Sequence, residues 1–384
     1  MSNLPKTAEL VIIGGGVIGT SIAYELAKRG MKDIVLVEGD TISSGSTGRC
    51  GGGIRAQWST PENVRLAMAS VERFKSLESE LETELEFEQG GYLILAHSDQ
   101  ELQQFESNVK MQKSLNLDVD LITPSQAKEI VPSLNIEKIT GATWCPSDGS
   151  INPFLLNFAY ARAARQKGVK IFQHTKVIGI EHKAQKITGI NTDQGKISTN
   201  QLVNAAGGYA GFIGKLAGLD LPVVPHRHEI LATEQINRFF KNMIMSFEYN
   251  LYFRQVMDGG IVGGQTNPGE LPGTDIKSGL TFLKEMSVKL THFIPKLKQV
   301  KVIRQWAGLY CTSPDAQPIL GKIENLAGYY QAIGFSGHGL MLAPRTAVLM
   351  ANCIADPDFQ DEDLSRLNLD RFKHGIVSGE RSVV

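Results

Sequence analysis

The apolar residues near the start of the chain alternate between short continuous runs and an amphipathic stretch. The run Leu10–Ile13 predicts a buried strand, and Ile34–Val37 predicts a second one. Between them, Ile18, Ile22 and Leu26 recur on one face of a helix. This strand–helix–strand pattern indicates a parallel sheet at the beginning of an α/β fold.

Similar patterns predict further elements along the chain. We expect helices after Thr60 and at residues 100–115, 153–166, 275–293 and 340–354. We expect strands at residues 91–96, 169–172, 176–182, 186–192 and 202–206. Between about residues 221 and 300, alternating apolar positions and turns rich in Gly and Pro are typical of an antiparallel sheet. The polar residues after Asp356 are expected to be partly mobile.

The turn between the first strand and its helix has the pattern G-x-G-x-x-G. Gly14 permits a tight turn, Gly16 lets the backbone approach a pyrophosphate, and Gly19 lets the helix pack on the strand. The helix begins at Val17 and Ile18, where free N–H groups and the helix dipole can hold phosphates.

A carboxylate marks the end of the second strand. Glu38 lies 24 residues beyond Gly14 and can accept hydrogen bonds from an adenosine ribose. Together with the glycine turn it predicts a dinucleotide site; the alternative is a tight strand–helix turn without a ligand.

Composition narrows the class of protein. The 384 residues are 42% hydrophobic and 21% charged, which is ordinary for a globular protein of one or two domains. Lys plus Arg (39) nearly balance Asp plus Glu (40), so we expect no nucleic-acid partner and no anionic-membrane surface. The polar start is unlike a secretory signal, and no apolar stretch reaches the roughly 18 residues of a spanning helix. The four scattered cysteines have no metal-site spacing, so we expect no metal and a reducing, cytoplasmic location.

The order of elements suggests which dinucleotide is bound. Three short strands follow the helix at residues 153–166, and the strand after them runs into Gly207. This order is typical of the second half of an FAD domain, whereas a nicotinamide dehydrogenase more often continues β-α-β. We expect Val177, Ala206 and Gly207 to line the cofactor site.

The fold class predicted is α/β: a Rossmann-like FAD-binding domain of the glutathione-reductase type, interleaved with an antiparallel substrate domain. We place the FAD-binding domain at residues 1–85, 146–220 and 301–384, and the substrate domain at residues 86–145 and 221–300.

Six motifs occur in order along nearly the whole chain. They are Ser44-Gly45-Ser46-Thr47-x-Arg49-Cys50-Gly51-x-Gly53-Ile54-Arg55, Thr123-Pro124, Asp148-Gly149, Pro225-x-x-His228, Arg304-x-Trp306-Ala307-Gly308-x-Tyr310-x-x-x-Pro314-Asp315 and Gly334-Phe335-Ser336-Gly337-His338-Gly339. With them the chain resembles the D-amino-acid-oxidase-like flavoproteins, and within these the sarcosine oxidase beta-subunit group. It is most similar to the beta subunits of heteromeric L-proline dehydrogenases.

The resemblance implies FAD bound in an extended form. Ser46, Thr47 and Arg49 would lie at its second phosphate or ribitol, while Gly51 and Gly53 would leave room for the flat isoalloxazine. A flexible connector is the alternative for this loop.

A second glycine turn lies near the end of the chain. Gly337, His338 and Gly339 precede the helix at Leu340, whose N-terminus would face the flavin N1–C2=O edge and stabilise a reduced anionic flavin.

Departures from the family refine these expectations. Gly308 stands where monomeric sarcosine oxidases attach FAD through a cysteine, so we expect non-covalent FAD. Asn152 stands where heterotetrameric sarcosine oxidases bind FMN covalently through a histidine, so FMN is expected only at an interface with a partner subunit. The lysine that promotes reaction with O2 in the oxidases is replaced by Ile261, which favours another electron acceptor.

The substrate site is less determined. Tyr310 replaces the arginine that clamps the substrate carboxylate in D-amino acid and glycine oxidases, so Arg55 is the best candidate for this clamp; a structural salt bridge is the alternative. Candidates for handling the amine proton are His228, Tyr252, Tyr310 and His338.

The predicted function is FAD-dependent oxidation of an amino acid or secondary amine such as proline or sarcosine. Hydride moves to flavin N5, an imine forms, and the electrons pass to an acceptor other than O2. One alternative is an oxidase that uses O2 and makes H2O2. Another is an FAD-carrying subunit that is active only with an alpha-type partner that carries electrons onward.

Overall fold

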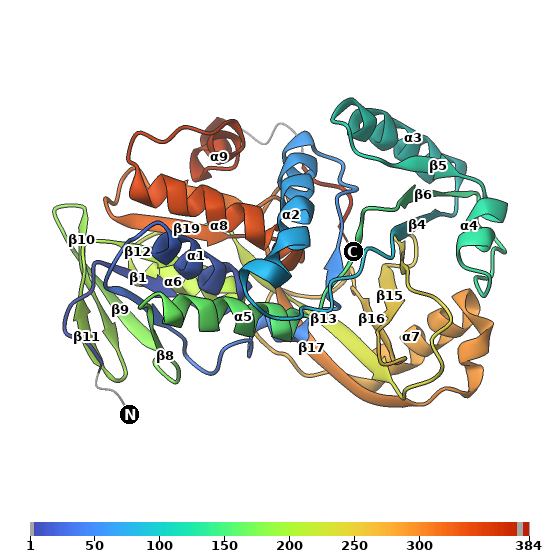
Figure 1. The fold of residues 1–384 in the computed structure, drawn as a ribbon, viewed down its shortest axis with the longest axis horizontal. Helices are drawn as coiled ribbons and strands as arrows, with labels where there is room; N and C mark the ends of the chain where they lie inside the picture. Colours follow the sequence, from blue (N-terminus) through green and yellow to red (C-terminus); the bar gives the residue numbers. More distant parts are fainter. Residues whose placement is uncertain (1–3, 375–378, 384) are drawn as a thin grey trace.

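The computed structural model describes residues 4–374 and 379–383, and two large β-sheets organise them side by side (Figure 1). The first is a six-stranded sheet, as predicted for a nucleotide-binding unit. Its order is β18 (Ile319–Lys322), β19 (Tyr329–Ile333), β12 (Leu202–Asn204), β1 (Leu10–Ile13), β2 (Ile34–Val37) and β8 (Lys170–Phe172). All neighbours in it are parallel except β18 and β19.

Both faces of this sheet are covered, because alternate residues of each strand point to opposite sides. Leu10 and Ile12 face a core that includes residues of α1 (Val17–Lys28), α5 (Pro153–Gln166) and α8 (Gly339–Ala355). Val11 and Ile13 face a second core, shared with a three-stranded sheet and α6 (Ala210–Leu216). That small sheet has the order β11 (Gly195–Ser198), β10 (Lys186–Thr192), β9 (Val177–Lys183). The predicted strand–helix–strand start and the strands predicted at residues 169–172, 176–182 and 186–192 are therefore confirmed. The first of these, β8, joins the six-stranded sheet, and β11, which we did not predict, completes the small sheet.

The second sheet has eight strands and is mainly antiparallel. Its order is β17 (Val302–Thr312), β13 (Val224–Thr233), β16 (Ile261–Gln265), β15 (Leu251–Gln255), β14 (Met243–Ser246), β4 (Tyr92–Ala96), β6 (Gly141–Cys145) and β5 (Asp120–Ile122). Only β14 and β4 run parallel. Because β17 pairs with β13, this sheet extends beyond residue 300, where we placed the end of the substrate domain. The division into domains otherwise stays a prediction.

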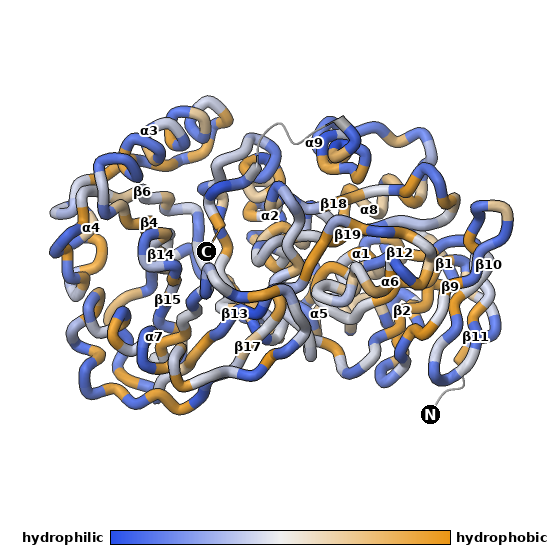
Figure 2. The backbone as a smooth tube through the Cα atoms, turned by 180° about the vertical axis from the view of Figure 1, so that it is seen from behind, coloured by the Kyte–Doolittle hydropathy of each residue, from blue (hydrophilic) through white to orange (hydrophobic). Residues whose placement is uncertain are grey.

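Helices flank the eight-stranded sheet. α7 (Leu280–Phe293) buries Phe282, Met286 and Leu290 against it. It begins at Leu280 and not at residue 275, because Gly279 is the extended N-cap. At the other end lie the largely hydrophilic α3 (Asp99–Ser114) and α4 (Pro124–Ile130) (Figures 1 and 2). No helix in the described ranges is both long and apolar enough to cross a membrane.

The loop after β2 runs between the two sheets. It contains a 3₁₀ turn (Ser46–Arg49) and β3 (Gly53–Ile54), which pairs with β7 (Gly149–Ser150). Asn157 of α5 fixes this loop to the glycine turn, since its Nδ2 donates to the carbonyl of Gly15 at 2.9 Å and to Ser43 Oγ at 2.8 Å. α2 (Pro61–Glu80) follows the loop and packs on α8.

The chain after α8 is more ordered than its polar composition suggested. It forms α9 (Glu362–Arg366) and 3₁₀ turns, including Leu369–His374, where Arg371 pairs with Asp315. Residues 379–383 then lie between the start of α2 and the eight-stranded sheet, near the centre of the molecule (Figures 1 and 2). Glu380 and Ser382 are buried there. The expected mobility of the tail stays a prediction, and its residues 375–378 and 384 lie outside the described residues.

Candidate functional site

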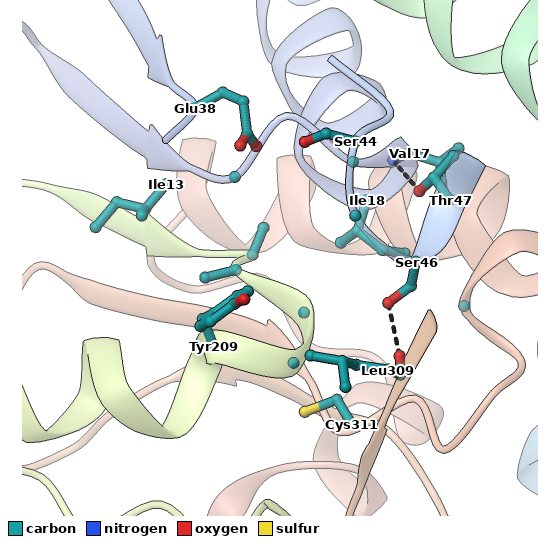
Figure 3. A pocket seen from close by; sticks show the side chains of 18 of the residues that line it. Ile13, Val17, Ile18, Glu38, Ser44, Ser46, Thr47, Tyr209, Leu309 and Cys311 are labelled. Atoms are coloured by element: carbon teal, nitrogen blue, oxygen red, sulfur yellow. Dashed lines mark hydrogen bonds between the residues drawn. The ribbon is translucent and has the colours of Figure 1, made fainter. Parts of the chain in front are cut away.

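A cavity of about 490 Å³ lies at the carboxyl ends of β1 and β2, where open α/β sheets bind their ligands (Figure 3). Most of the predicted cofactor residues line it. They are Gly14, Gly16, Val17, Ile18, Glu38, Ser46, Thr47, Arg49, Val177, Ala206, Gly207, Gly337, Gly339 and Leu340.

The three glycines of the first turn have different roles. Gly14 has a φ of +119°, and a Cβ there would lie 2.4 Å from the carbonyl oxygen of Ala205. A Cβ on Gly19 would lie 2.0 Å from the carbonyl oxygen of Gly14, so both residues are required by the fold. Gly16 has a φ of −76°, and the nearest atom to its Cβ would be Thr47 Oγ1 at 3.2 Å. The fold therefore excludes a Cβ much less strictly at Gly16, where it would meet one hydroxyl in a tight contact. This suits a ligand that approaches the backbone here.

The acidic residue at the end of β2 is held over the glycine turn. Glu38 Oε2 accepts a hydrogen bond from the N–H of Gly15 at 2.6 Å, and Oε1 accepts from the N–H of Asp40 at 2.9 Å (Figure 3). Its carboxylate therefore stands at the cavity with a defined orientation, as the dinucleotide pattern predicted.

The loop hydroxyls are already used within the protein. Thr47 Oγ1 accepts from the N–H of Val17 at 3.0 Å, and Ser46 Oγ donates to the carbonyl of Leu309 at 2.6 Å (Figure 3). Arg49 donates to the carbonyls of Ser44 and Ala307. These contacts hold the 3₁₀ turn between α1 and β17. We therefore expect backbone N–H groups, more than these hydroxyls, to bind phosphate.

Several lining residues carry no motif. They come from the position directly before β9, from the turn before α6, from α6 itself and from the last part of β17: Lys176, Tyr209, Phe212, Leu309 and Cys311. Only the tertiary structure brings these residues to one place. Burial raises the pKa of the Cys311 thiol to about 11, so it stays protonated, and non-covalent binding of FAD stays our prediction.

A second, much smaller cavity adjoins the first. Both are lined by Cys50, Tyr310, Ser336, Gly337 and Leu340, so they are neighbours in one site. The second is also lined by the predicted residues Gly51, Gly53, Arg55, Tyr252 and His338. Gly19 and His228, which we also predicted, line neither cavity.

The glycine loop beside this second cavity is shaped by tyrosines. A Cβ on Gly51 would lie 2.5 Å from the Tyr252 ring, and a Cβ on Gly53 would lie 2.3 Å from Tyr92 Oη. Arg254 of β15 also donates to the Gly51 carbonyl at 2.7 Å. Packing on the tyrosines is therefore one reason for glycine at these positions. Because both glycines also line the smaller cavity, the place of the isoalloxazine beside them stays a prediction.

Arg55 is a buried cation without a carboxylate partner. Its side chain is 2% exposed, Nη2 donates to the Ser382 carbonyl at 2.5 Å, and Nε has no hydrogen-bond partner. Its guanidinium lies 3.8 Å from the Trp58 ring centroid. Among the described residues no carboxylate lies within ion-pair distance of it, so a structural salt bridge is not what holds it. Burial lowers its pKa, which shows that the free cation is costly there.

His228 stacks with two tyrosines of the site. Its ring centroid lies 4.3 Å from that of Tyr310 and 5.5 Å from that of Tyr252, with the planes nearly parallel. Nδ1 lies 3.0 Å from Thr266 Oγ1, and Nε2 has no partner. Burial lowers the pKa of His228 to about 3, so the ring is neutral near pH 7 and is a weak base.

His338 is the N-cap residue of α8 and is 2% exposed. Its ring lies 4.5 Å from that of Trp58, and neither nitrogen has a hydrogen-bond partner. Burial lowers its pKa to about 4. It therefore adds no charge to the site near neutral pH.

Ile261, the position that we compared with the oxidase lysine, faces away from the site. Ile261 is fully buried in the core shared with α7. A Cβ on Gly264 would meet His228 and Tyr252, so even-numbered positions of β16 face the site. Val262, opposite Arg254 in the sheet, is the site-facing residue. Because it too is neutral, the argument against an O2-directing lysine is unchanged.

The sequence pattern of the FAD-dependent oxidoreductase family, DAO, matches residues 9–353. The chain belongs to this family. Among solved structures, this family member is similar to L-proline dehydrogenase from P. horikoshii, with 39% identity, a TM-score of 0.92 and coverage of 97% of this chain and 99% of that one. It is also similar to glycine oxidase from Geobacillus kaustophilus, with 25% identity, a TM-score of 0.88 and coverage of 96% and 99%.

Curated relatives differ in length. The chain is 30% identical to mitochondrial dimethylglycine dehydrogenase of Rattus norvegicus over 95% of its own length, but spans only 45% of that protein. It is 28% identical to sarcosine oxidase subunit beta of Arthrobacter sp, covering 98% of this chain and 93% of the relative.

The residues present fit FAD, the cofactor of the family. The unfilled space at Gly16, the oriented Glu38 carboxylate and the N-terminus of α1 suit its adenosine and pyrophosphate. The N-terminus of α8 at Gly339 lies where the two cavities meet and suits the flavin ring.

Substituting Gly16 tests the phosphate site. Gly16→Ala should fold, since the nearest atom is a hydroxyl at 3.2 Å, but should bind FAD at least about 10-fold more weakly because a methyl group blocks backbone approach. Absorbance of the purified protein and its melting temperature measure the two effects. Gly273→Ala, where no atom lies within 4 Å of the new Cβ, is the matched control. Full FAD content in Gly16→Ala would place the pyrophosphate elsewhere.

The buried His228 predicts a pH dependence of stability. Its folded pKa is below its ordinary value of 6.5, so the unfolded chain binds the proton first and stability falls as pH drops from about 7 toward 3. At pH 5 the effect is about 2 kcal/mol. The free energy of unfolding, measured in urea, should fall between pH 7 and pH 5 in the parent. In His228→Gln this fall should be smaller, by about 2 kcal/mol. Exposed His182→Gln should behave like the parent, and equal losses in His228→Gln and the parent would show that His228 is protonated in the fold.

Proposed function

We propose that the protein oxidises a small amino acid or secondary amine that carries a carboxylate, taking hydride from the carbon next to the amine and leaving an imine. FAD, when bound, supplies the hydride acceptor at N5. The observation that carries this proposal is Arg55, a buried cation without a carboxylate partner in the cavity that adjoins the flavin cavity. An anionic ligand would offset the desolvation of its guanidinium.

The surroundings of Arg55 favour binding of the substrate amine in its neutral form, which hydride loss requires. His228 is neutral, and burial raises the pKa of Tyr310 and Tyr252 far above neutrality, so both phenols stay protonated. In this desolvated site an ammonium group is disfavoured, which lowers the substrate's amine pKa without a dedicated base. The phenols and the His228 ring would orient the amine and exclude water.

Asp148 fixes the backbone next to Arg55 by hydrogen bonds. It is fully buried and accepts from the N–H of Ala56 at 2.7 Å and from Gln57 Nε2 at 3.0 Å. These bonds hold the backbone directly after Arg55, so the guanidinium is presented from a rigid strand end.

An acceptor other than O2 fits the neutral Val262 on the site face of β16. The relatives named dehydrogenases agree with this choice, whereas the sarcosine oxidase relative supports the alternative of H2O2 production. Because that relative is named subunit beta, we also propose a partner subunit that carries electrons onward, with FMN only at their interface. The four unpaired cysteines support a reducing, cytoplasmic location.

An anaerobic substrate screen tests this function. L-proline, D-proline, hydroxyproline, sarcosine and glycine are mixed with the holoprotein, and bleaching of the flavin absorbance is followed. Bleaching by at least one of them supports the proposal, and admission of air then separates oxidase from dehydrogenase by the rate at which the colour returns. No bleaching by any amino acid or amine would contradict it.

The role of Arg55 makes a sharper prediction. Arg55→Lys should keep FAD but lose two-point contact with the carboxylate, which weakens carboxylate substrates by about 1.5–3 kcal/mol, roughly 10- to 100-fold. Arg55→Met should lose more, because no cation remains. Stopped-flow bleaching over a range of substrate concentrations measures the affinity. Pyrrolidine, which lacks the carboxylate, is the control and should react about equally with all three proteins. Unaltered affinity of Arg55→Met for the amino acid would make Arg55 structural, with Arg49, Arg254 and His228 as the next candidates.

A further inference from the structure

The segment of residues 379–383 is anchored at the start of α2 by one carboxylate. Glu380 is 6% exposed; its Oε1 accepts from the N–H of Ser59 at 2.9 Å, and its Oε2 accepts from the N–H of Thr60 at 3.2 Å. Thr60 Oγ1 and Asn63 Nδ2 also donate to Oε2, at 2.9 and 3.0 Å. Thr60, the N-cap, makes no side-chain cap bond of its own, so Glu380 supplies the cap and complements the helix dipole.

The hydrogen bonds of Glu380 place the residues that follow it beside Arg55. The N–H of Ser382 donates to Glu380 Oε1 at 2.9 Å, which turns the Ser382 carbonyl toward Arg55. Val383 then lines the small cavity together with Met245 and Tyr92. A segment more than 320 positions away along the chain thus forms part of the site.

The hydrogen bond from Arg55 to the Ser382 carbonyl can position the guanidinium without neutralising its charge. A carbonyl oxygen holds the guanidinium of Arg55 by one N–H but carries no charge. The carboxylate of Glu380 is occupied by the helix start, and it lies outside ion-pair distance of Arg55. The positive charge of Arg55 therefore remains available to an anion, and its Nε is without a partner.

We propose that residues 379–383 form one wall of the substrate site: the Ser382 carbonyl positions the Arg55 guanidinium for the substrate carboxylate, and Val383 limits the size of the substrate ring or side chain. The proposal rests on the carboxylate-binding role of Arg55 above. It makes Glu380 a positioning residue that acts through Ser382 and Arg55, and Val383 a determinant of specificity.

Releasing the anchor tests the positioning role. In the holoprotein, Glu380→Ala should keep FAD and weaken L-proline, or the best carboxylate substrate of the screen, about 10-fold, while the limiting rate of flavin bleaching and the reaction with pyrrolidine change little. Glu380→Gln, which keeps an acceptor for the helix N–H groups, should recover part of the affinity. Arg381→Ala, at the adjacent exposed residue, is the matched control and should equal the parent. In an Arg55→Met background, Glu380→Ala should have no further effect on carboxylate affinity.

A binding readout separates this test from turnover. Tetrahydro-2-furoate has the carboxylate and ring of proline but no amine to oxidise, and the shift that it causes in the flavin spectrum reports its affinity. Glu380→Ala should weaken it about as much as it weakens the substrate. If Arg55→Met weakens it and Glu380→Ala does not, the segment is only structural and this inference fails while the proposed function stands. If neither variant weakens binding of tetrahydro-2-furoate, both this inference and the proposed carboxylate-binding role of Arg55 fail.

Val383 is tested by ring size. Val383→Ala should improve the six-membered L-pipecolate relative to L-proline about 10-fold, because removal of two methyl groups leaves space for the one extra methylene of that ring. Val383→Phe should weaken both. Melting temperature and FAD content identify a folding defect, and an unchanged ratio in correctly folded Val383→Ala would show that Val383 is not a wall of the site.

Discussion

The packing of the glycine loop between the two sheets is the constraint on which the site depends. The Gly51 carbonyl accepts from Arg254, while Tyr252 and Tyr92 leave no room for a Cβ on Gly51 or Gly53. At one end of this loop, Thr47 accepts a hydrogen bond from α1 and lines the larger cavity. At the other end, Arg55 lines the smaller cavity beside the eight-stranded sheet. A single stretch of backbone therefore sets the distance between the cofactor and the substrate clamp. A side chain at either glycine would displace the loop or the tyrosine that it meets.

Burial is the main cause of the shifted pKa values around the smaller cavity. The cation of Arg55 is retained by an aromatic face, by a carbonyl and by longer-range attraction to Asp148 and Glu380, although burial lowers its pKa. The same burial raises the pKa of Asp148 to about 6 and keeps the histidines and tyrosines of the site neutral. Among the described residues that line the smaller cavity, Arg55 is the only charged one. This arrangement suits a ligand with one carboxylate and an amine that must lose its proton.

Two helix N-termini lie at the larger cavity. α1 begins after Gly16, and α8 begins after His338, and both first turns line the larger cavity. Their partial positive charges suit the pyrophosphate and the reduced flavin ring, respectively. A third helix, α2, uses its N-terminus within the protein, where it holds Glu380 and with it the wall of the substrate site. The same physical feature is thus available to a ligand at α1 and α8, while at α2 it binds a chain segment.

The sequence by itself determined the parts that depend on neighbours along the chain. The turn at residues 14–19, the acidic end of β2 and the motif that ends in Arg55 could be recognised because local spacing defines their geometry. Only the tertiary structure decided which way strands face and what covers the site. Strand alternation in β16 turns Val262, and not Ile261, toward the site, because pairing with β15 and packing on α7 set the register. The contact between Arg55 and Ser382 joins residues 327 positions apart. No local pattern could reveal it, since it exists only when helix capping, burial and sheet packing act together.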